Sequence, residues 1–180
     1  ALIFRVSAQQ TAVEHFESGV NKSKSGDYIG ALAAFSSAIS MNPDNPQSYF
    51  NRGLAKQALK DNRGAINDFD KAIDINPRDA NAFLYRGLSK SNQEDNRAAI
   101  QDFNRSIEIS PNEVYAYLQR GFLRVKMNEF SKAIPDFSKV IELNPESKEK
   151  YQAFFSRGVS KSKLEDHFGA IQDFTNAIEI

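Results

Sequence analysis

Apolar residues recur along the chain at the spacing of one helix face, and polar or proline-containing breaks separate the runs. In one run the apolar positions are Ala65, Ile66, Phe69, Ala72 and Ile73. This spacing of three and four predicts a helix with one buried side. The helix must end at Asn76, because Pro77 cannot continue it. The run before it begins after Asn45, with Pro46 at the first helical position. Neither helix can bury its apolar side alone, so the pattern predicts helices that pack in pairs.

The paired pattern repeats with a period of 34 residues. Four classes of position keep this step: Gly19, Gly53, Gly87 and Gly121; Ala31, Ala65, Ala99 and Ala133; Phe35, Phe69, Phe103 and Phe137; and Pro43, Pro77, Pro111 and Pro145. A period of this size is typical of stacked helical hairpins. The small residues let two helix backbones approach closely, and the phenylalanine fills the space beyond that contact.

A fifth copy follows with the same residue types in a shifted register. Its glycine, Gly158, lies 37 residues after Gly121, so three residues have been inserted. The insertion lies near Lys148 to Lys150. It either lengthens the start of the fifth pair's first helix or forms a loop.

These glycines, alanines, phenylalanines and prolines resemble the tetratricopeptide repeat, whose pattern is W-x2-L-G-x2-Y, then A-x3-F, then P. The resemblance covers residues 12–180 and implies an all-α fold, a right-handed α-α superhelix of five hairpins, with protein binding in place of catalysis. The expected domains are an N-terminal tail or short extension at 1–11 and an array at 12–180, with repeats near 12–45, 46–79, 80–113, 114–150 and a truncated 151–180. We number the positions of each repeat from Ala12, Pro46, Ala80, Val114 and Tyr151.

The chain departs from the family pattern at position 7, where an arginine replaces the leucine before the glycine. The arginines are Arg52, Arg86, Arg120 and Arg157, and aspartates stand at position 23: Asp68, Asp102, Asp136 and Asp173. The first repeat has Ser18 and Ala34 at these two positions, so both charges are lost together. Since an unpaired buried charge is costly, the joint loss predicts Arg–Asp pairs, within one hairpin or between neighbours. The alternative is two independent, solvated charges.

The resemblance also implies a binding surface on the first helices, at positions 2, 5, 9 and 12. Positions 5 and 9 are apolar in all five repeats, and Tyr115 and Val125 add apolar groups in the fourth. The expected partner-binding groove is Phe16, Val20, Phe50, Leu54, Leu84, Leu88, Tyr115, Leu118, Phe122, Val125, Phe155 and Val159. A continuous apolar groove would suit a peptide or an amphipathic helix of a partner protein. The alternative is that these residues pack against the neighbouring hairpin as core.

Some family members bind the acidic C-termini of heat-shock chaperones through a carboxylate clamp of lysines, asparagines and an arginine. Counted from the first repeat, the clamp positions hold Phe16, Val20, Asn51, Asn81 and Tyr85. Only Asn51 fits. We therefore expect no chaperone binding by this mechanism.

Composition narrows the remaining classes of function. The 23 Lys and Arg balance 23 Asp and Glu, so no net field attracts nucleic acid or an anionic membrane. There is no cysteine, and the two histidines, His15 and His167, are far apart in register. We expect no catalytic residue, no metal site and no cofactor. The apolar start of the chain is too short to insert into a membrane.

The expected partner is thus a protein or peptide, with self-association of the array ends into a homo-oligomeric scaffold as the alternative. In that alternative the apolar positions serve as core, and end residues such as Phe174 and Ile178 meet another copy. The sequence does not determine the cellular compartment. A cytoplasmic protein is slightly favoured, and an exported form follows if residues 1–10 are the remnant of a signal peptide.

Overall fold

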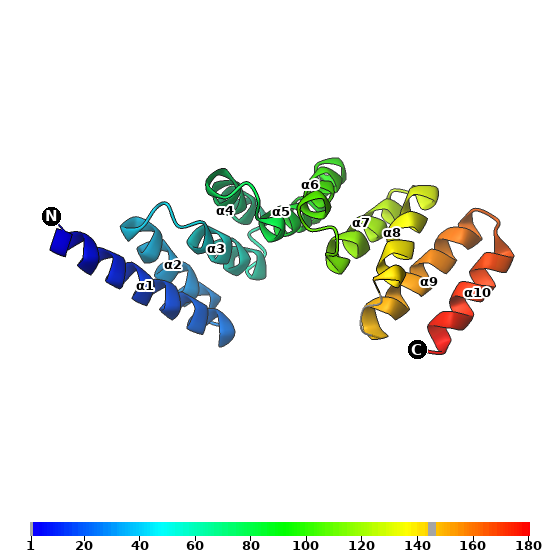
Figure 1. Ribbon diagram of the computed structural model, residues 1–180, viewed down its shortest axis with the longest axis horizontal. Coiled ribbons are helices and arrows are strands. Elements are labelled where there is room, and N and C mark those ends of the chain that lie inside the picture. Colours follow the sequence, from blue (N-terminus) through cyan, green and yellow to red (C-terminus); the bar gives the residue numbers. More distant parts are fainter. Residues whose placement is uncertain (1, 144–146) are drawn as a thin grey trace. The chain divides into compact units, whose positions relative to one another are not determined.

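The structure, a computed structural model, describes residues 2–143 and 147–180, with side chains at 11–143 and 148–180 (Figure 1). The described residues form ten α-helices in sequential pairs. Their bounds are α1 Leu2–Lys24, α2 Tyr28–Met41, α3 Pro46–Ala58, α4 Asn62–Ile75, α5 Ala80–Asn92, α6 Asn96–Ile109, α7 Val114–Lys126, α8 Phe130–Glu142, α9 Ser147–Lys163 and α10 His167–Ile178. The predicted all-α fold is confirmed, while Pro145 lies outside the described residues.

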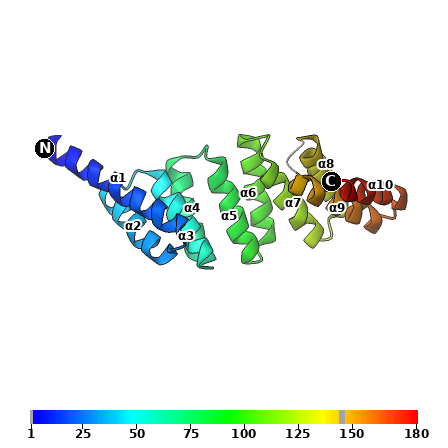
Figure 2. The same ribbon diagram turned by 90° about the horizontal axis from the view of Figure 1, so that it is seen from below.

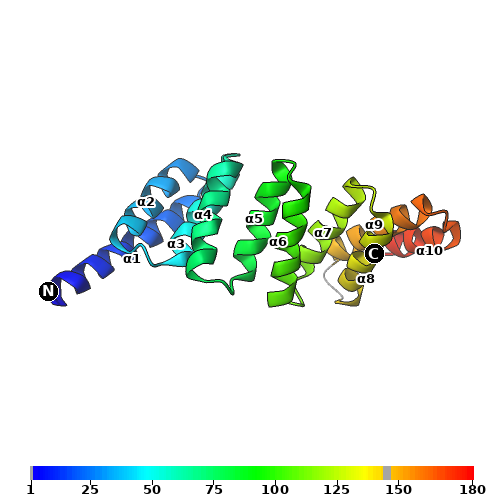
Figure 3. The same cartoon turned by 90° about the horizontal axis from the view of Figure 1, so that it is seen from above.

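The chain divides within α6 into two compact units, residues 1–99 and 100–180, which we describe separately. In the first unit α1 packs on α2 and α3 on α4, and α2–α3 and α4–α5 contacts join successive hairpins (Figure 2). In the second unit α7 packs on α8 and α9 on α10, and α8–α9 contacts join the two hairpins (Figure 3). None of the helices built from the described residues combines the length and hydropathy that crossing a bilayer requires.

Every first helix ends in the same left-handed turn, at position 15 of its repeat. The residues with positive φ are Gly26, Lys60, Glu94, Asn128 and Glu165. In the first repeat the amide of Asp27 donates back to the carbonyl of Lys22, which closes the helix end. The side chain of Asp27 then accepts from the amide of Gly30 and caps the second helix at 2.8 Å. This shared turn fixes where each second helix begins.

In four repeats the glycine of the first helix is required by a phenylalanine of its own hairpin. A Cβ atom on Gly53 would lie 2.7 Å from Cε1 of Phe69, far inside van der Waals contact. The same close approach occurs for three further pairs: Gly19 with Phe35, Gly121 with Phe137, and Gly158 with Phe174. The packing role expected for these repeated residues is therefore seen in both units.

Two helices differ from the repeat in length. Because α1 begins at Leu2, the segment before the expected boundary at residue 12 continues the first helix. That segment contains no glycine or proline that would stop a helix. The second, α9, has 17 residues where α7 has 13. Of the two alternatives for the insertion near Lys148 to Lys150, the structure has the lengthened helix.

Replacing Gly121 by alanine tests the close approach. The added carbon would lie 2.7 Å from Cε1 of Phe137, and that ring is fully buried. We expect a net loss of about 2 kcal/mol in the free energy of unfolding, because overpacking outweighs the helix preference of alanine. Urea unfolding followed by circular dichroism measures it. Asn67→Ala, on the exposed side of α4, is the control and should cost little. A gain in stability for Gly121→Ala would contradict the packing described here.

Candidate functional site

The arginine at position 7 binds the aspartate at position 23 across its own hairpin. Arg52 donates through Nε and Nη2 to the two carboxylate oxygens of Asp68, at 2.9 and 2.7 Å. Arg157 makes the same two bonds to Asp173, at 2.9 and 2.6 Å. Arg120 also pairs with Asp136, but here Nη2 donates to Oδ1 at 2.6 Å and Nε is shared between Oδ1 and Oδ2, at 3.1 and 3.2 Å. These aspartates are buried, as is Asp102. Two parallel bonds from a planar guanidinium are the geometry in which a buried carboxylate is best compensated.

The same arginines also reach back to the preceding hairpin, to the residue at position 25. Nη1 of Arg52 donates to the hydroxyl of Ser36 at 3.0 Å, and Nη1 of Arg157 donates to the hydroxyl of Ser138 at 3.0 Å. The other two acceptors are Asp70 for Arg86, at 2.7 Å, and Asn104 for Arg120, at 2.6 Å. One side chain therefore holds its hairpin closed and ties it to the hairpin before.

An aromatic ring one turn earlier on the same helix supports each guanidinium. The distance from Cζ of the arginine to the ring centroid lies between 5.2 and 5.7 Å in every repeat that has the arginine. The rings are Tyr49, Phe83, Tyr117 and Phe154. A cation over a ring face contributes about 0.5–2 kcal/mol. The aromatic residue thus orients the arginine that follows it.

A second cation, at position 11, also pairs with Asp68, Asp136 and Asp173, and the reasoning from sequence missed it. Lys56 lies 2.8 Å from Asp68, Arg124 lies 2.7 Å from Asp136, and Lys161 lies 2.9 Å from Asp173. The sequence suggested only that these long side chains cover apolar surface. The sequence did hold a signal for these ion pairs. Each of these cations lies four residues after the arginine, which places both on the same helix face.

The charges around Asp173 set its protonation. Burial alone would raise the pKa of this carboxyl group. The hydrogen bonds from Arg157 and Lys161, and the positive charges of both side chains, outweigh burial and hold the pKa below its ordinary value. Asp173 is therefore ionised at neutral pH and acts as a structural anion.

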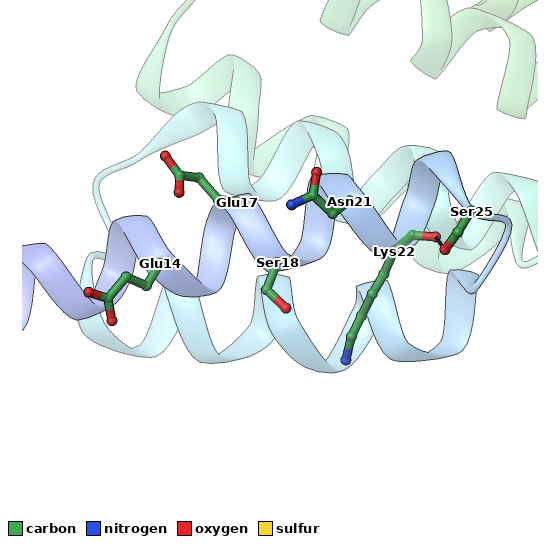
Figure 4. A pocket seen from close by; sticks show the side chains of 6 residues that line it. All are labelled: Glu14, Glu17, Ser18, Asn21, Lys22 and Ser25. Atoms are coloured by element: carbon green, nitrogen blue, oxygen red, sulfur yellow. Dashed lines mark hydrogen bonds between the residues drawn. The ribbon is translucent and has the colours of Figure 1, made fainter.

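The first repeat lacks this arrangement and has a polar outer face instead. At position 7 it carries Ser18, and at position 23 Ala34. An open hollow of about 570 Å³ lies along α1, lined by Glu14, Glu17, Ser18, Asn21, Lys22 and Ser25 (Figure 4). Figure 4 shows these side chains ranged along the helix, with the Ser25 hydroxyl bonded to the carbonyl of Lys22.

In the first unit the expected groove residues largely pack within the hairpins. The rings of Phe16 and Phe50 lie 5.7 Å from those of Phe35 and Phe69, respectively. The ring of Tyr85 closes over Phe50 at 5.6 Å. Leu84 is buried, and Val20, Leu54 and Leu88 are partly buried.

In the second unit the corresponding residues reach the surface more fully. Tyr115 on α7 is 41% exposed and Phe155 on α9 is 47% exposed. Tyr151, which the sequence did not single out, stacks on Phe155 with ring centroids 6.0 Å apart and is 45% exposed. The partly buried groove residues here are Phe122, Val125 and Val159. Tyr151 and Phe155 thus form an exposed aromatic pair on α9, and Tyr115 is a further exposed ring on α7, which contacts α9.

Leu84 and Leu118 correct the expected groove. They are 3% and 1% exposed, so neither offers a surface to a partner. Leu118 belongs to the cluster formed with Phe137, Val140 and Ala153. Helical register places these leucines on the inner side, but the neighbouring helices cover them. At these two positions the alternative, packing as core, describes the structure.

Asn51, the one residue that fits the carboxylate clamp, donates to the carbonyl of Gln47 at 2.8 Å. Among the described residues, no three histidine or acidic side chains form a group that could hold a metal ion. The arrangement offers ring faces and apolar side chains in place of acid–base chemistry.

Sequence models of one family match most of the repeat region. A model described as Tetratricopeptide repeat matches residues 85–154, another of that description matches 46–79, and one described as TPR repeat matches 24–60. Among curated proteins, none matches the chain closely enough to count as a relative.

Solved structures of repeat proteins are similar to this one. The crystal structure of MamA protein matches over 94% of this chain and 91% of that chain, with a TM-score of 0.86 and 24% identity. YrrB, a TPR protein with an unusual peptide-binding site, matches over 93% and 85%, with a TM-score of 0.78 and 21% identity. The first TPR of Spaghetti (RPAP3), bound to the HSP90 peptide SRMEEVD, matches over 66% and 94%, with a TM-score of 0.65 and 25% identity. These likenesses show the fold.

The lowered pKa of Asp173 predicts a pH dependence of stability. The carboxylate stabilises the fold fully above its unfolded pKa of about 4, and this stability is lost as pH falls toward the lower folded pKa. Asp173→Asn should therefore lower the free energy of unfolding by about 3 kcal/mol at neutral pH, since it breaks a buried pair. Denaturant unfolding from pH 3 to 7 measures the difference.

The loss should be constant above about pH 5 and shrink below about pH 4. Asp74→Asn is the control, because Asp74 is exposed and its ion pair with Lys71 is long, at 3.7 Å. It should change stability little at any pH. A loss for Asp173→Asn that did not vary with pH would show that its charge is not what stabilises the hairpin.

Proposed function

Because the chain is a tetratricopeptide repeat protein, we propose that it holds an apolar segment of a partner polypeptide on the first helices of its second unit, α7 and α9. The family is non-catalytic, and its domains typically bind proteins or peptides. The proposal concerns which surface binds and what kind of segment it accepts.

The stacked pair of Tyr151 and Phe155 carries the proposal. Both rings are nearly half exposed although they are large and apolar, and each offers part of its face to solvent. The ring of Phe155 packs on the ring of Phe174 in the same hairpin, with 5.7 Å between the ring centroids. An exposed ring that is held in place loses little conformational entropy on binding.

The surface extends from this pair along two helices that pack on each other. On α9, Tyr151, Phe155 and Val159 are four residues apart and so share one face. On α7, Tyr115, Phe122 and Val125 follow the corresponding spacing of seven and three. An apolar surface of this kind suits an amphipathic helix that inserts residues at helical spacing, or an extended apolar segment.

Two of the similar structures support peptide binding, but not the same peptide chemistry. YrrB has an unusual peptide-binding site, and the Spaghetti domain holds an acidic HSP90 peptide. In the present chain two positions where a carboxylate clamp needs lysine and asparagine hold Phe16 and Val20. An apolar partner segment is therefore favoured over an acidic C-terminus.

The second candidate is a scaffold that self-associates through its ends. The observation in its favour is the exposed apolar side of α10, where Ile171 is 65% and Ile178 84% exposed. Against it stands the polar outer face of α1, which does not match that side in polarity. We therefore favour the binding surface on α7 and α9.

Selection from a library of random displayed peptides tests the proposal. We expect the enriched peptides to carry apolar residues at helical spacing, because the surface offers rings and few charges. Phe155→Asp should weaken their binding about tenfold or more, as loss of a central aromatic anchor does. Since Phe155 is 47% exposed, the variant should keep the helicity of the native chain by circular dichroism.

Leu164→Asp is the matched control, because Leu164 is also 47% exposed but lies in the turn between α9 and α10. It should bind the selected peptides as the native chain does. Enrichment of acidic peptides, or equal binding by Phe155→Asp, would refute the proposed surface.

A further inference from the structure

On both helices of the proposed binding surface, the apolar face ends in a lysine. On α9, Lys163 comes four residues after Val159 and eight after Phe155. On α7, Lys126 comes four residues after Phe122. Residues four apart lie on the same face of a helix. Each lysine therefore continues the face that carries the apolar side chains.

The two lysines occupy the same position, 13, in successive repeats. Helices α7 and α9 contact each other and run in the same direction (Figure 1). Lys126 and Lys163 therefore stand at the same end of the binding surface, in the last turn of each helix. Both residues are exposed. This end of the surface thus presents two positive charges to solvent.

In the part of the chain that the structure describes, no carboxylate pairs with either lysine. The acidic side chains of the neighbouring turns have other partners or point elsewhere. Glu129 bonds to Lys132 at 2.9 Å, and the side chain of Asp166 caps α10. Glu165, in the same turn as Asp166, makes no ion pair with Lys163. The two charges at position 13 are therefore available to a partner.

The cations at position 11 of the same helices behave differently. Arg124 and Lys161 lie 2.7 and 2.9 Å from the buried carboxylates of Asp136 and Asp173. They belong to the packing of their hairpins. A step of two residues turns a helical side chain away from that packing, which is why position 13 points to the binding face.

Closing a helix does not require a lysine at position 13. A cation in the last turn complements the helix dipole, but α3 and α5 end with Ala58 and Asn92 at this position. In the first unit only α1 has the lysine, Lys24, and its neighbour α3 does not. Lysines stand at position 13 of two successive repeats only on α7 and α9, where the exposed rings also lie.

We propose that the partner segment carries an aspartate or glutamate at one end of its apolar residues, and that Lys126 and Lys163 hold this side-chain carboxylate. The inference rests on the proposed function and specifies the partner further. Two ammonium groups attract a carboxylate and disfavour a cationic residue at that end. They therefore fix the direction in which the segment lies along α7 and α9. The segment stays apolar over the rings, unlike a peptide that is acidic throughout.

The probe is an apolar peptide enriched on the native chain from the random displayed library, synthesised with an amidated C-terminus. We expect an acidic residue at the same end of each enriched sequence. Replacing it by its amide should weaken binding about fivefold, as loss of two exposed ion pairs does. This difference should shrink when NaCl is raised from about 50 mM to about 500 mM, because salt screens exposed charges. Titration calorimetry measures both affinities.

The double variant Lys126→Ala, Lys163→Ala should bind the acidic peptide and its amide form equally. Because both lysines are exposed, this variant should melt as the native chain does. Lys24→Ala is the matched control, since Lys24 is exposed at the same repeat position in the first unit. It should keep the native preference of about fivefold for the acidic peptide.

The inference is overturned if the enriched apolar peptides lack an acidic residue at one end, or if the double variant keeps the preference. It is also overturned if binding needs a free C-terminal carboxylate, since the source of the charge is then the chain end. These results leave the proposed surface in place. Equal binding by Phe155→Asp removes the surface itself, and this inference with it.

Discussion

The stacking of the hairpins after the first depends on an arginine that has three partners at once, as Arg157 shows. The guanidinium lies over a ring of its own helix, forks onto a buried aspartate of its own hairpin and donates to a polar group of the preceding hairpin. A planar guanidinium has five N–H donors and can bond all of these partners at the same time. A lysine ammonium lacks the two parallel N–H groups that bind a carboxylate. Because the aspartate is costly to bury alone, closing a hairpin and docking it on its neighbour become one event.

This coupling is absent from the first repeat, which carries Ser18 and Ala34 in place of the arginine and the aspartate. The face of α1 that carries Ser18 is polar and also includes Glu14. The arginine–aspartate link therefore belongs to the hairpins that follow the first.

Much of the fold could be predicted because it rests on residues that recur at a fixed step, such as Gly121 and Phe137. The joint loss at Ser18 and Ala34 likewise pointed to a link between the two charges. The burial of Leu84 and Leu118 could not be predicted. Helical register gives the direction in which a side chain points, but it does not show which side chains the next hairpin covers. The extension of α1 to Leu2 was missed because these residues precede the first one that keeps the repeat step. The ion pair of Lys161 required knowing where Asp173 lies.

A triple-mutant cycle on Arg157, Asp173 and Ser138 tests the central claim most directly. Each residue is changed to alanine singly and in combination, and denaturant unfolding gives the coupling energies. We expect Arg157 to couple to Asp173 by about 2–3 kcal/mol and to Ser138 by about 0.5–1 kcal/mol. Any coupling between Asp173 and Ser138 should vanish once Arg157 is alanine, because the arginine is what joins them. Additive losses at all three sites would contradict the account.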